Sequence, residues 1–355
     1  MTHKKFEPPK GETYEALQVG AGIRPDLGYS RDDGEDNISS LNPYYAELTG
    51  MYHVWKNVKD KDIVGICHYR RYPLDAFNRA MSGSEYEMIL KNYDLICSKL
   101  ITLPNTYYYG FSQNHRIEDL EECRRVIKEL YPLDYPVFEE VIHSNRTYFG
   151  NIIVAKKELY DSYCSWLFPI FFRVHEKRAP YIEKYNDYNK RVYGFISEIL
   201  QYVYVKSKGL KAYEALVGML SEKKESAELK ERLSVYFKEK DWEAAKAYLE
   251  AMLRKRPDLI MEASDLDGEL KLAMELLIIC EYDKKSILEL TGDWEELMNY
   301  VRALNRSVLG SCKVTGSESL VRLMTGDGSG DELFIKNPPG DKAKEIAIRI
   351  LGGER

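Results

Sequence analysis

The stretch Asp36-Asn-Ile-Ser-Ser-Leu-Asn-Pro-Tyr-Tyr45, with Trp55-Lys-Asn57 and Ile63-Val-Gly-Ile-Cys-His-Tyr-Arg-Arg-Tyr72 downstream, decides the fold of this chain. Asn42-Pro43 supplies an N-cap and a first-turn proline, and apolar residues then recur at helical spacing. The β-branched run from Asp62 to Cys67 predicts a buried parallel strand. Ligands bind outside the carboxyl ends of strands in open α/β sheets, so the His and Arg residues that follow predict a site for an anionic ligand.

Strands and helices alternate on both sides of this stretch. The alternation favours a parallel or mixed sheet flanked by helices, so the predicted fold class of this region is α/β. The loop over 20–42 is rich in Gly, Asp and Ser and is long enough to be functional. Other predicted strands cover 13–19, 93–97 and 150–155, and other predicted helices cover 116–131, 135–144, 157–176 and 187–203.

The composition changes after about residue 222, where Lys, Glu, Ala and Leu dominate and strand signals nearly vanish. Residues 241–254 match residues 293–306 at Asp, Trp, Glu, Tyr, Ala and Arg. Residues 229–257 resemble one tetratricopeptide unit, although the spacing of the two copies does not fit the standard period and leaves a generic helical bundle open. We therefore predict an α/β domain over residues 1–222 and an all-α domain of helical hairpins over residues 223–355.

Composition argues against several classes of protein. The 355 residues carry 51 Lys and Arg against 57 Asp and Glu, a formal net charge of −6, which argues against general nucleic-acid binding. Six cysteines are scattered without a C-x-x-C pair, as expected of reduced thiols in a cytoplasm. No apolar run reaches the length of a membrane span, and no signal peptide is recognisable. We expect a cytoplasmic protein, or one held peripherally at the inner membrane face.

The first candidate site is His68-Tyr69-Arg70-Arg71, directly after the buried strand. Guanidinium groups match phosphate oxygens with bidentate geometry and keep their charge, so Arg70 and Arg71 suit one diphosphate. The competing interpretation is that both arginines pair with surface acids and that His68 is a polar residue with ordinary partners.

Two further candidates are carboxylate-rich. Asp36 and Asn37 could bind ribose or sugar hydroxyls, or a metal, although a solvated acidic loop fits the composition better. His115 and Asp119 lie close enough in sequence to form a general-base pair. First-turn acids that complement a helix dipole are an equally good explanation of Asp119.

The last candidate is Arg191-Val-Tyr-Gly-Phe-Ile-Ser-Glu198, in which Arg191 and Glu198 lie within two turns of one helical region. An internal salt bridge is the competing interpretation. The sequence has no Walker A loop, G-x-G-x-x-G, H-E-x-x-H or G-x-S-x-G motif. Support for a P-loop ATPase, a Rossmann dehydrogenase, a zincin or an α/β-hydrolase is correspondingly weak.

Several co-linear segments resemble a bacterial family known as domain of unknown function 4422. The resemblance spans roughly residues 1 to 215, and the family is found among capsule, O-antigen and exopolysaccharide genes. The segments that carry it are Asp36-Asn-Ile-Ser39, Glu47-Leu-Thr-Gly50, Trp55-Lys-Asn57, Val64 to Tyr72, His115 to Asp119, Ser144-Asn145, Asn151 to Val154 and Arg191 to Glu198.

The resemblance implies a glycosyltransferase of the GT-A type, in which one α/β domain binds a nucleotide-sugar at the strand ends. Some members are linked with galactofuranose transfer. The implied reaction moves galactofuranose or another hexose from a UDP-sugar to a cell-surface glycan or a lipid-linked glycan. A carboxylate removes the acceptor proton, and cationic groups stabilise the departing nucleoside diphosphate.

The implied roles fall on two groups of residues. Asp119 is the predicted base, with Glu198 as its rival and His115 beside it. Within the donor-binding group, the strand-end cations would hold the diphosphate, the acidic loop would contact sugar or ribose, and the first residues would lie near the nucleotide. The donor-binding group consists of Thr2, His3, Asp36, Asn37, His68, Arg70 and Arg71.

The chain departs from the family pattern in two places. Many GT-A enzymes hold Mn²⁺ or Mg²⁺ with Asp-x-Asp after the strand that follows a helix like 43–57, where this chain has His68-Tyr69-Arg70. Carboxylates are the usual ligands of such hard ions, so a metal cofactor is doubtful, and His68 with Arg70 or Arg71 would neutralise the diphosphate instead. Family members also begin with an apolar strand before a segment like Thr2-His3-Lys4, so we expect that strand to be missing from this chain.

Two other classes of function stay open. A non-catalytic sugar-nucleotide-binding or scaffold protein would act through its helical repeats and bind a protein partner there. A nucleotidyltransferase would need carboxylate-bound Mg²⁺, for which the sequence offers no clear pair. Binding of UDP-sugars with slow donor hydrolysis distinguishes the enzyme from the scaffold.

Overall fold

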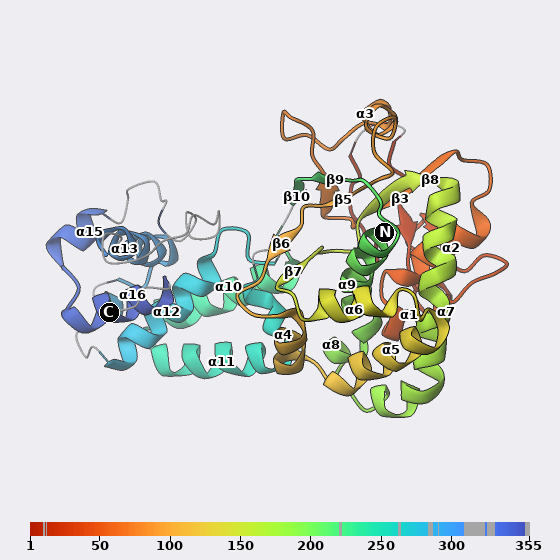
Figure 1. Ribbon diagram of the computed structural model, residues 1–355. Helices are drawn as coiled ribbons and strands as arrows, with labels where there is room; N and C mark the ends of the chain where they lie inside the picture. The colour runs from red at the N-terminus through yellow and green to blue at the C-terminus, as the bar shows by residue number, and fades with distance from the viewer. Residues whose placement is uncertain are drawn as a thin grey trace. The chain divides into compact units, whose positions relative to one another are not determined.

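The computed structural model describes residues 1–351 apart from 10, 12, 220–221, 262–263, 283–286, 290, 309–323 and 325–330. The chain divides into two compact units, Met1–Leu220 and Ser221–Arg355 (Figure 1). Each unit has its own hydrophobic core. The first unit combines a mixed sheet with helices, whereas the described elements of the second, from Lys224 onward, are helices.

A four-stranded mixed sheet forms the centre of the first unit. Its order is β3-β8-β5-β9, with β8 antiparallel to both of its neighbours and β9 parallel to β5. Strand β5 is buried along its whole length, as expected of a strand covered on both faces. The strands are β3 (Ile63–Ile66), β5 (Leu95–Ser98), β8 (Ile153–Lys156) and β9 (Ala212–Ala215).

Residues 1 and 2 connect this sheet to two more parallel strands, β1 and β2. Thr2 forms a parallel bridge with Gln18. The Met1 nitrogen donates to the Cys67 carbonyl at 2.8 Å, and the Met1 carbonyl accepts from the Tyr69 N–H at 3.0 Å. The order across the sheet is therefore β2, β1, residues 1–2, β3, β8, β5, β9. The added strands are β1 (Leu17–Gln18) and β2 (Ser30–Arg31).

The strand order reverses between residues 1–2 and β3. Such a reversal is the switch point at which open α/β sheets form their ligand crevices. Strand β8 runs antiparallel, with Ile66 paired to Ile153, so the residues before β8 lie at the edge where β3 ends. This edge, which we call the switch-point edge, therefore collects the segments that follow β3 and precede β8.

Helices cover both faces of the sheet. Leu95 and Cys97 of β5 belong to the large core, whereas Ile96 between them faces a smaller core that includes Tyr86 of α3. The large core includes residues of α2, α5, α7 and α9. The helices are α1 (Asn42–Tyr45), α2 (Leu48–Asn57), α3 (Gly83–Ile89), α4 (Tyr107–Asn114), α5 (Ile117–Leu130), α6 (Tyr135–Ile142), α7 (Lys157–Ile182), α8 (Asp187–Lys190) and α9 (Val192–Ser207). Short strands β4 (Arg71–Pro73), β6 (Ile101–Thr102), β7 (Arg146–Thr147) and β10 (Val217–Met219) form two separate pairs.

The single helix expected over 43–57 is two helices, and the break positions a functional side chain. Ala46 has φ 49° and ψ −126°, which no helix accommodates. The Asn42 side-chain amide donates to the Ala46 carbonyl at 2.7 Å and holds the break. Glu47 follows it directly and lies against Gly194 of α9, where an added Cβ would be 3.5 Å from the Glu47 carboxylate.

The second unit consists of helices with capped starts. The Asp241 side chain accepts from the Ala244 N–H, and Asp293 caps the corresponding helix at the Glu295 and Glu296 N–H groups. The tetratricopeptide-like arrangement stays a prediction. No helix in the described ranges combines the length and hydropathy that a membrane crossing needs. The helices are α10 (Lys224–Lys238), α11 (Trp242–Lys255), α12 (Glu269–Tyr282), α13 (Trp294–Ser307), α15 (Asp331–Lys336) and α16 (Asp341–Ile350).

Candidate functional site

A group of charged and polar side chains gathers at the switch-point edge. They come from the α1–α2 break, from the segments that follow β3 and precede β8, and from the start of α9. Most of them are partly buried, so they interact in a medium less polar than water. This switch-point cluster consists of Glu47, His68, Arg71, Asn151, Arg191 and Glu198.

Asn151 ties the cluster together. Its backbone is left-handed, with φ 48°, a conformation that asparagine tolerates better than most residues. Its buried amide donates to Glu47 Oε1 at 2.7 Å and to the Gly194 carbonyl at 2.9 Å. Its side-chain oxygen accepts from the Ser197 hydroxyl at 2.8 Å. These bonds fix the start of β8, the α1–α2 break and the start of α9 to one another.

His68 is a neutral side chain in this cluster. Its Nε2 lies 2.6 Å from the Gly150 carbonyl, and because a carbonyl only accepts, Nε2 carries the hydrogen. Burial lowers the pKa of His68 to about 4 against the attraction of Glu47, whose Oε1 lies 3.8 Å away, and the charge of Arg71 lowers it further. His68 therefore donates its one N–H to Gly150 and carries no positive charge at neutral pH, so it does not supply charge to a diphosphate.

Glu198 is a carboxyl group that can exchange a proton near neutral pH. Its Oε1 accepts from the Gly150 N–H at 2.7 Å. Burial raises the pKa of Glu198 to about 8, and the charge of Glu47 adds to this rise. Arg71 and Arg191 pull the pKa in the opposite direction without cancelling the effect of burial. A general acid or base works best with its pKa near the operating pH, so Glu198 suits that task.

Two guanidinium groups in the cluster, those of Arg71 and Arg191, have no hydrogen-bond partner among the described residues. Within the described part of the chain, no side-chain hydrogen bond or ion pair is formed by Arg71 or Arg191, and Arg191 Nε is buried. The Arg191 guanidinium lies over the Phe195 ring at 5.5 Å, and Arg71 lies against Gly150. Burial lowers the pKa of Arg71, and Arg191 contributes to the same effect. When Glu198 is protonated, the two positive charges of Arg71 and Arg191 outnumber the single negative charge of Glu47. The site therefore favours binding of an anion.

Comparison with known proteins gives this geometry a family. The model of the family described as "Domain of unknown function (DUF4422)" matches residues 1–209. The chain belongs to the DUF4422 family. It also resembles the solved apo structure of WbbM, a bifunctional glycosyltransferase, with a TM-score of 0.51 and 26% sequence identity. That match covers 60% of this chain and 44% of WbbM, so the chain spans less than half the length of that protein. No curated protein matches the chain.

Three of the predicted donor-binding residues of this DUF4422 chain lie close to the cluster without being part of it. His3 is exposed, and its ring meets the Tyr69 ring edge-on at 5.7 Å, which places it at the switch-point edge. Arg70 is buried, with its guanidinium 5.6 Å from the Tyr69 ring centre. Thr2 is buried in the sheet, and its hydroxyl donates to the Lys4 carbonyl at 2.5 Å.

Asp36 and Asn37 form bonds that close their own loop. Asp36 Oδ1 accepts from the Tyr52 hydroxyl at 2.8 Å. The Asn37 amide donates to the Gly34 carbonyl at 2.6 Å, and its Oδ1 accepts from the Ser39 N–H at 3.1 Å. Both residues are exposed, and these partners lie outside the switch-point cluster.

Asp119 and His115 have different partners and do not pair with each other. Asp119 is fully buried and accepts from Arg178 Nε at 2.8 Å, which joins α5 to α7. Burial raises the pKa of Asp119 despite this pairing. The His115 ring stacks on Phe195 with centres 4.4 Å apart, and burial lowers its pKa to about 4. His115 thus borders the cluster through Phe195, whereas Asp119 forms a structural ion pair.

Two members of the cluster, Glu47 and Asn151, were not among the candidate residues, and Arg191 was a candidate without an assigned role. Glu47, Asn151 and Arg191 all lie in segments that carry the family resemblance. The sequence did offer one local signal, the Gly150-Asn151 pair, because Gly and Asn are the residues that most readily take positive φ. Both residues take positive φ here, directly before a buried strand.

The cluster does not fit a divalent cation. No group of three or more His, Cys, Asp and Glu side chains in the described ranges is arranged to hold a metal ion. Glu47 and Glu198 each use an oxygen to accept an N–H, and both lie beside guanidinium groups that would repel a cation. The residues present match an anion, because guanidinium pairs bind phosphate oxygens in bidentate geometry.

Proposed function

We propose that this protein is a glycosyltransferase whose nucleotide-sugar donor binds with its diphosphate against Arg71 and Arg191. The observation that carries the proposal is a pair of partly buried guanidinium groups without hydrogen-bond partners among the described residues, at the switch point of the sheet. Membership of the DUF4422 family and the likeness to a bifunctional glycosyltransferase support it.

The proposed donor is a UDP-hexose, with UDP-galactofuranose as the first candidate. The proposed acceptor is a cell-surface glycan or its lipid-linked precursor in capsule, O-antigen or exopolysaccharide synthesis. His3, Tyr69 and Arg70 lie at the same edge of the sheet and are proposed to contact the nucleotide. Asp36 and Asn37 stay predicted sugar or ribose contacts.

In the proposed reaction, an acceptor hydroxyl attacks the anomeric carbon and Glu198 takes its proton. The glycosidic oxygen–carbon bond forms as the bond from the anomeric carbon to the diphosphate breaks. Negative charge develops on the leaving diphosphate, where Arg71 and Arg191 stabilise it. Glu198 is preferred to Asp119 as the base because Asp119 is fully buried in its pair with Arg178, whereas Glu198 is partly exposed beside the guanidinium groups.

The Glu47–Asn151 contact supports the same proposal. Burial acts to raise the pKa of Glu47, but His68, Arg191 and the Asn151 amide outweigh it and hold that pKa below its usual value. Glu47 is therefore a carboxylate, and its charge raises the proton affinity of Glu198, which makes the ionised Glu198 a stronger base for the acceptor hydroxyl. Glu47 and Asn151 are positioning residues in this scheme.

The function is tested by calorimetry of the full chain with a panel of UDP-hexoses, combined with an assay of donor hydrolysis. Saturable binding with slow hydrolysis supports the enzyme. Binding without any turnover, even with glycan acceptors, would favour a non-catalytic nucleotide-sugar-binding protein. No binding of any nucleotide-sugar would reject both. Arg125→Ala is the control variant, because Arg125 pairs with Glu122 and Glu129 on the surface of α5.

A further inference from the structure

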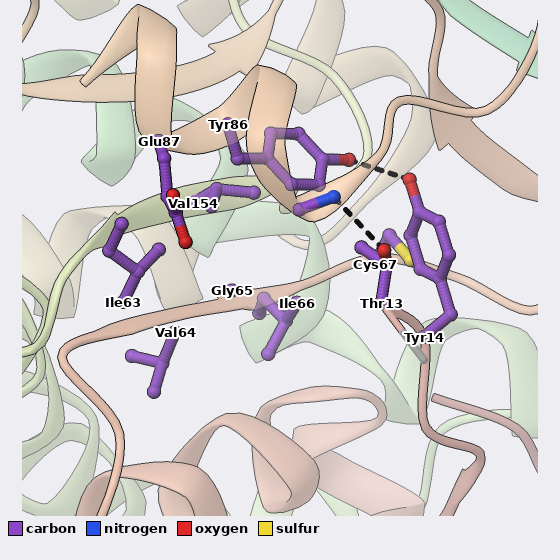
Figure 2. A pocket seen from close by; sticks show the side chains of 11 residues that line it. Thr13, Tyr14, Ile63, Val64, Gly65, Ile66, Cys67, Tyr86, Glu87 and Val154 are labelled. Atoms are coloured by element: carbon purple, nitrogen blue, oxygen red, sulfur yellow. Dashed lines mark hydrogen bonds between the residues drawn. The ribbon is translucent and has the colours of Figure 1, made fainter. Parts of the chain in front are cut away.

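The switch-point edge begins where β3 ends. Figure 2 shows β3 running to Cys67, the residue at which this edge begins, along one wall of a pocket whose lining includes no member of the switch-point cluster. Strand β1 and residues 1–2 run parallel to that strand end, so the segment after β1 leaves the sheet at the same edge. It forms a short 3-10 helix, η1 (Ala21–Ile23), and Arg24 follows directly. The start of the long loop over 20–42 therefore lies at the edge that carries the cluster.

A buried carboxylate fixes the start of this loop. Asp32 is fully buried, and it accepts from the Gly20 N–H at 2.8 Å and from the Ala21 N–H at 2.9 Å. It also accepts from the Ser39 hydroxyl at 2.5 Å. Asp32 therefore uses both of its oxygens on the loop itself. Arg24 is accessible to solvent, and within the described part of the chain it forms an ion pair with no carboxylate, so its positive charge is available to a ligand.

One hydrogen bond orients the Arg24 side chain. Arg24 Nη2 donates to Asn42 Oδ1 at 2.9 Å, and the amide group of the same Asn42 donates to the Ala46 carbonyl at the α1–α2 break. The start of α9 packs on that break, since an added Cβ at Gly194 would lie 3.4 Å from the Ala46 Cβ. Arg191 lies directly before this part of α9. The hydrogen bond therefore brings Arg24 to the side of the cluster on which Arg191 lies.

The guanidinium groups of Arg24 and Arg191 are close enough to affect each other. Desolvation of the guanidinium lowers the pKa of Arg24 against the attraction of Asp32, and the positive charge of Arg191 lowers it further. Repulsion between like charges is an energetic cost that a bound anion would remove. A third cation therefore lies beside the pair formed by Arg71 and Arg191.

The proposed reaction requires a cation beyond Arg71 and Arg191. When Glu198 is ionised and acts as the base, its charge and that of Glu47 together offset these two guanidinium groups. The donor brings two negative charges on its diphosphate, and a third develops when the bond to the anomeric carbon breaks. Charge that develops in the transition state is stabilised best by a preorganised group whose own charge is not already neutralised. Arg24 meets this requirement, because among the described residues no acid forms an ion pair with it.

We propose that Arg24 is a further catalytic residue, which binds the terminal phosphate of the nucleoside diphosphate as it departs. The bond between the anomeric carbon and the phosphate oxygen breaks, and its electron pair stays on that oxygen as the third negative charge. The Arg24 guanidinium donates to this phosphate, so Arg24 contributes more to the transition state and to the bound product than to the bound donor. This role rests on the glycosyltransferase function proposed above, and it connects the start of the loop over 20–42 to the chemistry.

Binding of UDP and of its β-methyl ester to the full chain tests this role without a sugar or an acceptor. The ester keeps the two negative charges of the donor. At about pH 7.5 UDP also carries the charge that develops in the reaction, because a terminal phosphate loses its second proton with a pKa of about 6. In calorimetry, we expect Arg24→Gln to weaken UDP binding by about tenfold or more and binding of the ester by no more than about threefold.

Two further variants serve as controls. Arg24→Lys keeps the positive charge and should retain most of the affinity for UDP. Arg125→Gln removes a charge elsewhere and should bind both compounds as the original chain does, because Arg125 pairs with Glu122 and Glu129 on the surface of α5. The amide of Arg24→Gln can still donate to Asn42 Oδ1, so the loop keeps that contact.

Kinetics with the UDP-hexose that the panel identifies as the donor give a second measurement. Arg24→Gln should lower kcat by about tenfold with little change in KM, as expected of an interaction made only in the transition state. Equal losses of UDP and ester affinity, or no loss of either, would overturn the role of Arg24 while leaving the donor site at Arg71 and Arg191 in place. An original chain that binds neither compound would overturn that donor site, and the role of Arg24 with it.

Discussion

Two clusters of buried charge in this chain differ in whether their positive charges are paired with carboxylates. In the second unit, Lys230 pairs with Glu222 at 2.6 Å and with Asp265 at 3.0 Å, and the Arg302 guanidinium reaches Glu269 at 3.4 Å. In the first unit, Arg71 and Arg191 have no such partners within the described residues, although acids lie near them. Buried charges that pair with one another are expected to have a structural role. Buried cations without a paired carboxylate destabilise the fold, and proteins tolerate them mainly at functional sites.

The largest expected effect separates the proposed base from its rival. Glu198→Gln should lower turnover by about 10²- to 10⁴-fold, because the side chain loses its proton acceptor while keeping its shape. Donor affinity measured by calorimetry should stay within a few-fold of the original. Asp119→Asn is the matched variant, and it should lower stability more than turnover, because Asp119 pairs with Arg178. Loss of turnover in Asp119→Asn with retention in Glu198→Gln would reverse the assignment.

The next effect tests whether the matched cluster is structural. Lys230→Met should lower the free energy of unfolding of the second unit by about 3–5 kcal/mol, because it leaves buried carboxylates without their cation. Urea denaturation followed by a probe within residues 221–355 measures this loss. Donor affinity should not change. If the free energy of unfolding did not fall, the pairing of Lys230 with its carboxylates would not be what stabilises the second unit.

The corresponding change in the unmatched cluster should act on binding. Arg71→Ala and Arg191→Ala should each weaken donor binding by about 10- to 100-fold, since a hydrogen bond to a charged group contributes about 1.5–3 kcal/mol. Neither variant should lower stability, because neither guanidinium has a hydrogen bond to lose among the described residues. Arg302→Ala is the reciprocal control, with lower stability and unchanged donor affinity. Equal donor affinity in all three variants would remove the basis of the proposed diphosphate site.

The polar residues that follow β3 could be identified from the sequence because that signal is local. A strand followed by His68 and two arginines is visible within ten residues of the sequence, and the structure puts His68 and Arg71 in one cluster. The strand itself differs from the buried parallel strand that was predicted, because β3 is only partly buried and pairs antiparallel with β8. The bond between Asn151 and Glu47 spans 104 positions, and no local pattern reports it. The pairing of Asp119 is equally hidden from the sequence, because its partner Arg178 lies 59 positions away on another helix.

A smaller effect concerns pH. Burial raises the pKa of Glu198 to about 8, and a base works only when ionised, so kcat/KM should rise about tenfold between pH 7 and 9. The sign for stability is opposite: the neutral carboxyl favours the folded state at low pH, and this advantage is lost as pH rises from about 4 through about 8. Glu198→Gln should flatten the stability profile of the first unit over that range. A rate that falls as pH rises above 7 would argue for Glu198 as an acid instead.

The smallest expected effect is that of metal removal, for which we predict no change. If Arg71 and Arg191 stabilise the departing diphosphate, excess EDTA should leave both donor binding and turnover intact, and added Mn²⁺ should not raise them. Protein dialysed free of EDTA is the control for effects of the chelator itself. A strict Mn²⁺ requirement would mean that the diphosphate charge is met by a cation from solution. The unmatched guanidinium groups would then need another ligand, because carboxylates rather than arginines hold such ions.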